Sequence, residues 1–361
     1  MEEKGKKGRI DYTLLLIVVL LVVIGLVILY STSAYNGQVK FHDSFYYLKK
    51  QAFATVLGIV LMLFVAGMDY HIWQRLAVFG YLAAVALSVA VMLFGREING
   101  SKRWLALGPF SFQPSEFAKV ALILFLADLV TKNVKTIGKM WTLCRIMFWI
   151  LPIVGLVGAS NLSTAIIILG IGVILIFVAS PKYAQFALMG IAGACFMGIF
   201  LALESYRLER LAIWRNPEKY EKGYQTLQGL YAIGSGGVFG VGIGNSVQKL
   251  GFVPEAQNDM IFSIICEDLG LAGAGIIVFL FLLLIWRFFL IASGSRDLFG
   301  ALIATGAMAH MMIQVILNIA VVTNTIPNTG ITLPFISYGG TSVMFLLIEM
   351  GLVLSVSQVV D

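Results

Sequence analysis

The chain has 361 residues, of which 59% are hydrophobic and 12% are charged, with a formal net charge of +6 and a mean hydropathy of +0.92. Soluble domains carry roughly 25% charged residues, and half that share does not cover the surface of a globule of this size. The composition therefore excludes a soluble enzyme, a disordered protein and a nucleic-acid-binding domain. We expect a polytopic membrane protein, in which the position of the charges matters more than their sum.

Ten apolar segments predict membrane crossings, each of which needs about 20 mostly apolar residues in a helix. The fourth is short and carries Lys119 and Asp128. Two uncharged runs are too long for one helix and break at polar stretches, Ser160–Thr164 in one and Thr323–Gly330 in the other. The segments are Tyr12–Ser31, Gln51–Met68, Leu76–Gly95, Phe117–Val130, the two parts of Ile146–Ser180, Tyr183–Leu203, Met260–Trp286 and the two parts of Leu298–Ile348.

The predicted fold is thus all-α, with residues 1–361 as one membrane domain. Residues 1–11 form a tail, and residues 204–259 form a long loop between the seventh and eighth helices. The apolar stretch of the first segment exceeds the 7–15 residues of a cleaved signal peptide, so we expect a retained helix.

Basic residues in the loops predict the orientation, because cytoplasmic loops are enriched in Lys and Arg. With the amino terminus in the cytoplasm, the inner loops receive Arg75, Lys132, Lys135, Lys139, Arg145, Lys182, Arg287 and Arg296, whereas the short outer loops receive Lys40, Lys49, Lys50, Arg96, Lys102 and Arg103. The bias favours cytoplasmic termini and places the 204–259 loop outside the cell membrane.

A polar cluster surrounds the start of the fourth helix. Ser115 is placed to cap this helix, and Glu116 and Lys119 share one face because they are three residues apart. At the outer membrane surface, Arg103 and Lys119 could hold an anionic group such as a phosphate. The alternative is an ion pair between Glu116 and Lys119 that only anchors the helix, and the charges alone leave both interpretations open.

The long outer loop contains Arg210 and the glycine-rich run Gly234–Ser246. No Lys-Ser/Thr pair follows the run and no strand precedes it, so it is not a P-loop. Glycine here favours an irregular chain that packs closely at the membrane surface, which is tolerated only against protein or a water-lined cavity.

Two acidic pairs flank the start of the eighth helix. Asp259 stands at its entrance, either as an N-terminal cap, the commoner role of Asp at such a position, or as a catalytic base, and Glu255 precedes it. Glu267 and Asp268 lie inside the helix, where they could cap or pair internally, and we assign them no catalytic role. The segment Leu333–Ser342 opens the last helix, where its small residues favour packing.

No spacing of His, Cys and carboxylate residues predicts a transition-metal site. The three cysteines are far apart and form no disulfide framework. The three histidines, His42, His71 and His310, are isolated in the sequence and belong to no catalytic triad pattern.

Taken together, ordered motifs along nearly the whole chain resemble the SEDS family (shape, elongation, division and sporulation), with its FtsW, SpoVE and RodA branches. They are Asn99–Trp104, Gln113–Glu116 with Lys119, Asn161–Ala165, Gly223–Gln225, Ala232–Gly237, Gly244–Ser246 with Gln248 and Lys249, Pro254–Glu255 with Asp259, and Leu333–Gly340. The variants Asn161–Ser163 and Gly244–Ser246 favour an FtsW-like or SpoVE-like member over RodA.

The resemblance implies a peptidoglycan glycosyltransferase that polymerises lipid II, an undecaprenyl-pyrophosphate-linked disaccharide-pentapeptide, on the outer face of the bacterial cytoplasmic membrane. It implies an inverting attack by a sugar 4-hydroxyl, with Asp259 as the catalytic base. Arg103, Lys119 and Arg210 are the candidate cations for the departing pyrophosphate, with Glu116 orienting Lys119. The other residues that the matched motifs offer for substrate binding are Lys102, Ser115, Gln225, Asn245, Glu255, Ser337 and Gly340.

The resemblance also implies a divalent cation, usually Mg²⁺, whose ligands the sequence does not locate, and no organic cofactor. The implied partners are a class B penicillin-binding protein, which would supply transpeptidation, and other membrane proteins of the divisome or elongasome. The chain departs from the family at Gln257–Asn258, where His-Thr is common, and at Ser160, where Pro is common.

Two other functions fit the composition. A flippase or transporter of the lipid-linked precursor would place its essential charges near the midplane and show internal repeats, whereas these polar clusters gather at the predicted outer side and we find no repeat. A non-catalytic scaffold of the division machinery would not require Asp259.

Overall fold

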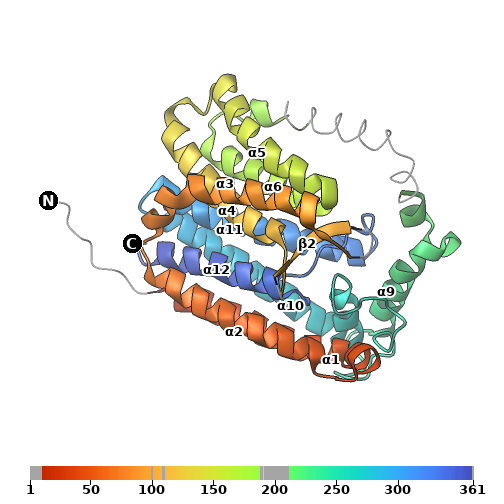
Figure 1. The fold of residues 1–361 in the computed structure, drawn as a ribbon. Helices are drawn as coiled ribbons and strands as arrows, with labels where there is room; N and C mark the ends of the chain where they lie inside the picture. Colours follow the sequence, from red (N-terminus) through yellow and green to blue (C-terminus); the bar gives the residue numbers. More distant parts are fainter. Residues whose placement is uncertain (1–9, 99–100, 108–109, 188–189, 191–210, 360–361) are drawn as a thin grey trace.

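The computed structural model describes residues 10–98, 101–107, 110–187, 190 and 211–359, which form a bundle of long helices (Figure 1). Three short strands between α3 and α4 are β1 (Arg96–Ile98), β2 (Ser101–Leu107) and β3 (Phe110–Phe112). The helices are α1 (Tyr12–Phe41), α2 (Tyr46–Gly67), α3 (Tyr70–Phe94), α4 (Pro114–Asn133), α5 (Met140–Ser160), α6 (Leu162–Ala179), α9 (Tyr224–Ser235), α10 (Ile261–Gly294), α11 (Leu298–Val322) and α12 (Gly340–Ser357).

Eight of the described helices are long and apolar enough to cross a membrane: α1, α2, α3, α5, α6, α10, α11 and α12. They confirm the predicted all-helical polytopic membrane fold. α4 is the fourth predicted crossing, and its charged side chains, among them Lys119 and Asp128, set it apart from the eight. The seventh predicted crossing, Tyr183–Leu203, lies largely outside the described residues, so the count of ten stays a prediction.

Both long uncharged runs break where the sequence predicts. α5 ends at Ser160 and α6 begins at Leu162, and the intervening Asn161 caps α6 by accepting a hydrogen bond from the Thr164 N–H (3.2 Å). α11 ends at Val322, and residues 323–339 connect it to α12. The break at Ser160–Thr164 thus has a capping residue, whereas the second break is a long irregular connection.

The loops gather at two ends of the bundle. At one end, the start of α1 meets the end of α12, because the Asp11 N–H donates to the Ser357 hydroxyl (3.2 Å), and Arg287 of α10 pairs with the same Asp11. At the other end, which we call the loop end, lie the sheet β1–β3, residues 211–260 and the connection 323–339. Contacts there join Ser163 to the Thr329 carbonyl (2.9 Å) and Thr341 to the Ser111 carbonyl (2.8 Å).

The three strands form a small antiparallel sheet in the order β1-β2-β3. Cα pairing of Glu97 with Lys102 joins β1 to β2, and pairing of Ala106 with Ser111 joins β2 to β3. The sequence analysis did not predict this sheet, because its strands are short and charged residues occupy positions within β1 and β2. The sheet leads the chain from α3 into α4 and so fixes where α4 begins.

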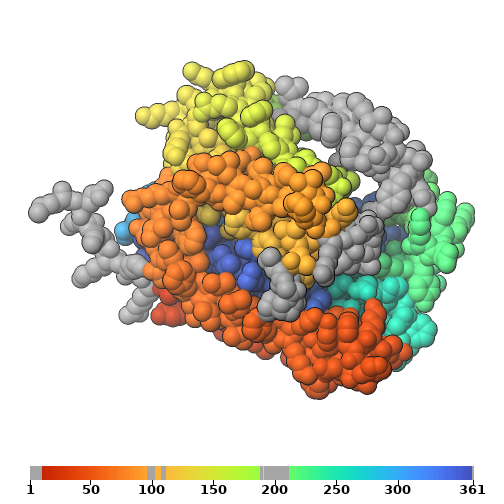
Figure 2. Space-filling view, in the orientation of Figure 1, coloured from red at the N-terminus to blue at the C-terminus, as the bar shows by residue number. Residues whose placement is uncertain are grey.

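α11 and α12 form the centre of the bundle. In their most apolar stretches, 67% of α11 and 72% of α12 is buried, compared with 28% of α3. Figure 2 shows blue atoms of the carboxyl-terminal region at the floor of a hollow bordered by the orange surfaces of α2 and α3. The more peripheral helices therefore present apolar side chains outward, whereas polar side chains on α11 face protein.

α10 changes direction at Gly270, whose backbone (φ 68°, ψ −172°) lies in a region that essentially only glycine occupies. Here the N–H groups of Leu271 and Ala272 donate to the carbonyls of Gly237 and Val238, both at 2.9 Å. A Cβ on Gly270 would collide with the Val238 carbonyl. The glycine-rich loop, residues 236–249, thus packs into the kink of α10, as the sequence predicts for an irregular chain near the membrane surface.

Candidate active site

The entrance to α4 sets the position of the first candidate residues. α4 begins with Gln113 at the N-cap and Pro114 in the first turn, where proline's fixed φ suits the helix and its missing N–H costs nothing. The prediction that Ser115 caps this helix is wrong, because Ser115 already lies within the first turn. Its hydroxyl instead accepts a hydrogen bond from the Gln113 amide (3.1 Å).

Glu116 and Lys119 form the predicted ion pair on one face of α4, with Lys119 Nζ 3.0 Å from Glu116 Oε1. Their side chains are 7% and 2% exposed, so water screens neither charge. The other carboxylate oxygen, Glu116 Oε2, is buried without a hydrogen-bond partner among the described residues. A buried pair contributes little net stability, because desolvation offsets the attraction. Such a pair holds one amine at a fixed place, whether for structure or for chemistry.

One face of α11 carries three buried polar side chains at four-residue spacing: His310, Gln314 and Asn318. Gln314 accepts a hydrogen bond from Lys119 Nζ (3.3 Å) and donates to the Thr332 carbonyl (3.1 Å). This single amide therefore joins the α4 cation to the connection between α11 and α12.

One turn further along α11, the Asn318 amide donates to the Ile331 carbonyl (2.7 Å) and to the Asp259 carbonyl (2.9 Å). Residues four apart in a helix are separated by roughly 6 Å along its axis. Lys119 and the main chain of Asp259 are therefore held by neighbouring turns of one rigid helix. The structure brings together two residues that lie far apart in the sequence.

Asp259 does not cap α10, whose N-cap is Met260 with no side-chain capping bond. The Asp259 side chain is partly buried, and Gly330 lies beside its carboxylate. None of the other described residues donates a hydrogen bond to this carboxylate. Burial raises the pKa of Asp259 to about 6, with a smaller contribution from the charge of Glu255. At neutral pH the carboxylate is ionised and has acceptor capacity to spare.

Glu255 differs from Asp259 because its carboxylate is fully engaged. Lys40 of α1 approaches one oxygen (3.2 Å), and Asn258 donates to the other (2.8 Å), to which Gln257 lies at 3.4 Å. Gln225 of α9 donates to the neighbouring Pro254 carbonyl (3.3 Å). Glu255 therefore ties α1 to the segment that carries Asp259.

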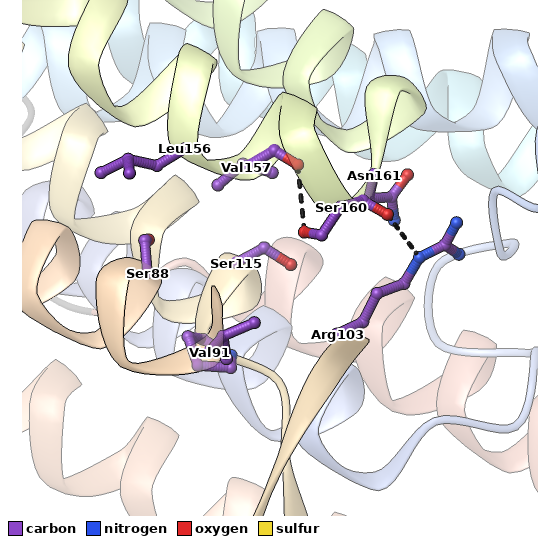
Figure 3. A pocket seen from close by; sticks show the side chains of 9 residues that line it. Ser88, Val91, Arg103, Ser115, Leu156, Val157, Ser160 and Asn161 are labelled. Carbon is purple, nitrogen blue, oxygen red and sulfur yellow. Dashed lines mark hydrogen bonds between the residues drawn. The ribbon is translucent and has the colours of Figure 1, made fainter. Parts of the chain in front are cut away.

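Arg103 and Ser115 meet at a second place at the loop end. The Arg103 side chain reaches from β2 toward the α5–α6 junction, where its Nε donates to the Ser160 carbonyl (3.0 Å) (Figure 3). Arg103, Ser115, Ser160 and Asn161 line a small cleft there. Lys102, the neighbouring candidate, is exposed.

The remaining candidates from the sequence have structural contacts of their own. The Ser337 hydroxyl accepts from the Leu333 N–H (2.8 Å), and Gly340 begins α12 against Ala54 of α2. Asn245 is exposed on the glycine-rich loop, where its amide donates to the Val241 carbonyl (3.1 Å). Arg210 lies outside the described residues.

The sequence analysis missed the α11 face. It treated Leu298–Ile348 as an uncharged run and His310 as isolated, yet His310 Nδ1 lies 2.8 Å from Glu349 Oε2 of α12, just beyond that run. The spacing of His310, Gln314 and Asn318 is a signal that was present, since polar residues recurring every four positions lie on one helix face. Among the described residues, no group of three or more His, Cys, Asp and Glu side chains is placed to hold a metal ion.

Comparison with known proteins decides the family. The sequence model of FTSW_RODA_SPOVE, described as a cell cycle protein, matches residues 12–361. The chain belongs to this family, the SEDS family. Stage V sporulation protein E of Bacillus subtilis is 39% identical over 366 residues, which cover 98% of both chains. A probable peptidoglycan glycosyltransferase FtsW of Trichlorobacter lovleyi is 35% identical over 353 residues, covering 96% of this chain and 93% of the relative.

Solved structures share the fold over nearly the full length. A chain from work on the structural coordination of polymerization and crosslinking by a peptidoglycan synthase complex has a TM-score of 0.83 at 29% identity, covering 96% of this chain and 97% of its own length. The rod shape determining protein RodA of Thermus thermophilus has a TM-score of 0.72 at 28% identity, with 96% of each chain covered. These findings confirm the predicted family, fold and enzyme class: an FtsW/SpoVE-like peptidoglycan glycosyltransferase of cell-wall synthesis.

Proposed function

We propose that this SEDS protein polymerises lipid II into β-1,4-linked glycan strands at the loop end of its bundle, which faces the outside of the cytoplasmic membrane. Both termini then lie in the cytoplasm. The observation that carries the proposal is the state of Asp259. Its carboxylate is ionised at neutral pH, partly exposed, and accepts no hydrogen bond from another described side chain.

In the proposed reaction, Asp259 removes the proton from the 4-hydroxyl of the acceptor sugar. The hydroxyl oxygen forms a bond to C1 of the donor sugar with inversion, while the bond from C1 to the pyrophosphate oxygen breaks. The proton ends on the Asp259 carboxylate, and the negative charge leaves with the undecaprenyl pyrophosphate. A base works best when its pKa lies near the operating pH, and a pKa of about 6 meets this condition.

Lys119 supplies positive charge for the departing pyrophosphate. Its amine is fixed by Glu116 and Gln314. Gln314 lies one turn of α11 away from Asn318, which donates to the main chain of Asp259. A charge that is already oriented in a water-poor site stabilises a developing anion without reorganisation. Arg103 at the α5–α6 cleft and Arg210 are the further candidate cations, and Lys102, Ser115, Gln225, Asn245, Glu255, Ser337 and Gly340 remain candidates for substrate binding or for shaping its site.

The divalent cation expected from the family has no preformed cage among the described residues. Mg²⁺ is commonly bound through one or two carboxylates together with substrate phosphates, and Asp259 or Glu255 would be the protein ligand in that arrangement. When bound, such an ion would neutralise charge on the pyrophosphate.

The proposed macromolecular partner is a class B penicillin-binding protein, which would crosslink the strands, alongside other membrane proteins of the divisome or elongasome. The support is the likeness to a chain studied in a peptidoglycan synthase complex. In this proposal the chain polymerises the glycan strands and the partner crosslinks them.

The test is polymerisation of purified lipid II by the reconstituted protein, alone and with its penicillin-binding partner. Asp259→Asn should lower the rate by about 10²–10⁴-fold, the typical contribution of a general base, while the variant folds and binds its partner normally. Asp43→Asn is the matched control, because it alters a carboxylate that pairs with Lys49 outside the candidate site. Full polymerisation by Asp259→Asn would remove Asp259 from this role.

The same preparation separates the rival functions. Lipid II flipping in liposomes without any glycan product would favour the transporter, and normal division complex assembly without either activity would favour the scaffold. Lys119→Met should also slow polymerisation strongly, and wild-type kinetics in that variant would make Lys119 a helix anchor only.

A further inference from the structure

The ring of His310 contacts hydrogen-bond acceptors on both sides. Its Nδ1 lies 2.8 Å from Glu349 Oε2, and its Nε2 lies 2.8 Å from Gln314 Oε1. A neutral imidazole has only one N–H, so it donates on one side alone. His310 is 1% exposed, so bulk solvent does not reach the ring.

The orientation of the Gln314 amide is fixed by two other contacts. Lys119 Nζ has only hydrogens to offer, so the atom 3.3 Å from it is the amide oxygen. The amide nitrogen then donates to the Thr332 carbonyl (3.1 Å). Reversing the amide would place its nitrogen, a donor, against the Lys119 amine, also a donor, and its oxygen, an acceptor, against the Thr332 carbonyl, also an acceptor. Gln314 therefore presents oxygen to His310, and His310 Nε2 must carry a proton.

The contacts around His310 are buried throughout, since Lys119 and Gln314 are each 2% exposed and Glu349 of α12 is 1% exposed. A buried polar group that loses its partner pays the full desolvation penalty, so these contacts hold their members in place. Glu349 therefore holds the ring of His310 from the Nδ1 side, while Nε2 faces Gln314.

We propose that His310, held in place by its Nδ1 contact with Glu349, is a positioning residue that fixes Gln314 and thereby the place of Lys119 in the active site. The chain of contacts runs from Glu349 through His310 to Gln314, which holds both Lys119 and the Thr332 carbonyl. The catalytic consequence rests on the proposed function, whereas the contact between His310 and Gln314 does not.

The contact is measurable directly, because the chain has only three histidines. In ¹⁵N-histidine-labelled protein in nanodiscs, solid-state NMR should show a protonated Nε2 whose signal vanishes in His310→Gln, persists when His42→Gln and His71→Gln are combined, and shifts in Gln314→Leu. An unprotonated Nε2 at His310, or a signal unchanged by Gln314→Leu, would overturn the proposal. This result does not depend on any enzyme activity.

The positioning role is tested by removing the pair together, since His310→Leu alone leaves Glu349 buried and unpaired. His310→Leu with Glu349→Leu should fold with a wild-type thermal midpoint yet lower kcat for lipid II polymerisation by about 10–100-fold at unchanged KM, as expected for a displaced catalytic group. A wild-type kcat in this double variant would overturn the role. If the wild-type protein makes no glycan, the proposed function fails, and the NMR result still decides whether His310 contacts Gln314.

Discussion

Two acidic pairs stand on either side of the start of α10, and the structure uses them differently. Before the helix, Asp259 keeps its carboxylate free of other described side chains. Inside the helix, the carboxylates of Glu267 and Asp268 already accept hydrogen bonds from other residues. Asp268 accepts from the Ser246 N–H (2.9 Å) and the Ser31 hydroxyl (3.0 Å), while Glu267 accepts from the Val247 N–H (3.1 Å).

Lys249 completes the second arrangement. Its amine is buried, 3.6 Å from Asp268 Oδ2 and 3.0 Å from the Ser31 hydroxyl. The glycine-rich loop is thereby held against α10, because the carboxylates of Asp268 and Glu267 accept hydrogen bonds from its backbone N–H groups. A structural acid thus differs from an acid available for chemistry in the hydrogen bonds that its carboxylate already accepts. Its place in the sequence is the weaker guide.

The largest expected effect comes from removing Asp268, which pairs with the buried Lys249 of the glycine-rich loop. Asp268→Leu leaves Lys249 buried without its acid, and removing one partner of a buried pair typically costs about 3–5 kcal/mol. We expect a strongly lowered thermal midpoint of the detergent-solubilised protein. Asp268→Leu with Lys249→Met should recover much of that loss, whereas an unchanged midpoint in the single variant would show that the loop is held by other contacts.

The kink of α10 is the next test, because the glycine-rich loop packs into it. Gly270→Ala places a side chain in a glycine-only conformation against the Val238 carbonyl, and we expect a loss of about 1–3 kcal/mol of stability. Gly275→Ala is the matched control in the same helix. No atom lies within 4 Å of a Cβ there, and alanine is the better helix former. Chemical denaturation of both variants measures the difference.

The pH dependence of polymerisation sharpens the other side of the comparison. Asp259 acts as a base only when ionised, so kcat/KM should fall about tenfold per pH unit below its pKa of about 6. Burial raises this pKa above the unfolded value of 3.8, so the contribution of Asp259 to stability is complete below that value and is lost as the pH rises through about 6. Asp259→Asn should therefore not lower the thermal midpoint at pH 7. A rate that is flat between pH 5 and 7 would contradict the assignment.

The smallest effect is expected at the exposed ion pair between Lys40 and Glu255, whose side chains are 50% and 39% exposed. Solvent-exposed pairs typically contribute 0.2–1 kcal/mol and are screened by salt. Lys40→Met should change stability by less than about 1 kcal/mol, and the difference should shrink in high salt. A larger loss would mean that Glu255 must be anchored to α1 for the loop end to fold.

Local patterns predicted the helices well, because apolar length and capping act over neighbouring residues. Asn161 is an example, since its side chain caps the very helix whose start the polar stretch marked. The same local reasoning misplaced the cap of α4 at Ser115, because Gln113 and Pro114 begin the helix earlier. It also overlooked His310, whose partner Glu349 lies on a different helix.

By itself, the sequence determined the membrane class, the presence and order of the long described helices, the Glu116–Lys119 pair and the family, since each depends on composition, spacing or ordered motifs. Only the tertiary structure decided that no other described residue donates a hydrogen bond to the Asp259 carboxylate, whereas Glu255 and Asp268 have partners. It also decided that Gln314 and Asn318 hold Lys119 and the main chain of Asp259 on neighbouring turns of α11. The physical reason is that hydrogen-bond partners and burial depend on residues distant in the chain, which become neighbours only when the helices pack.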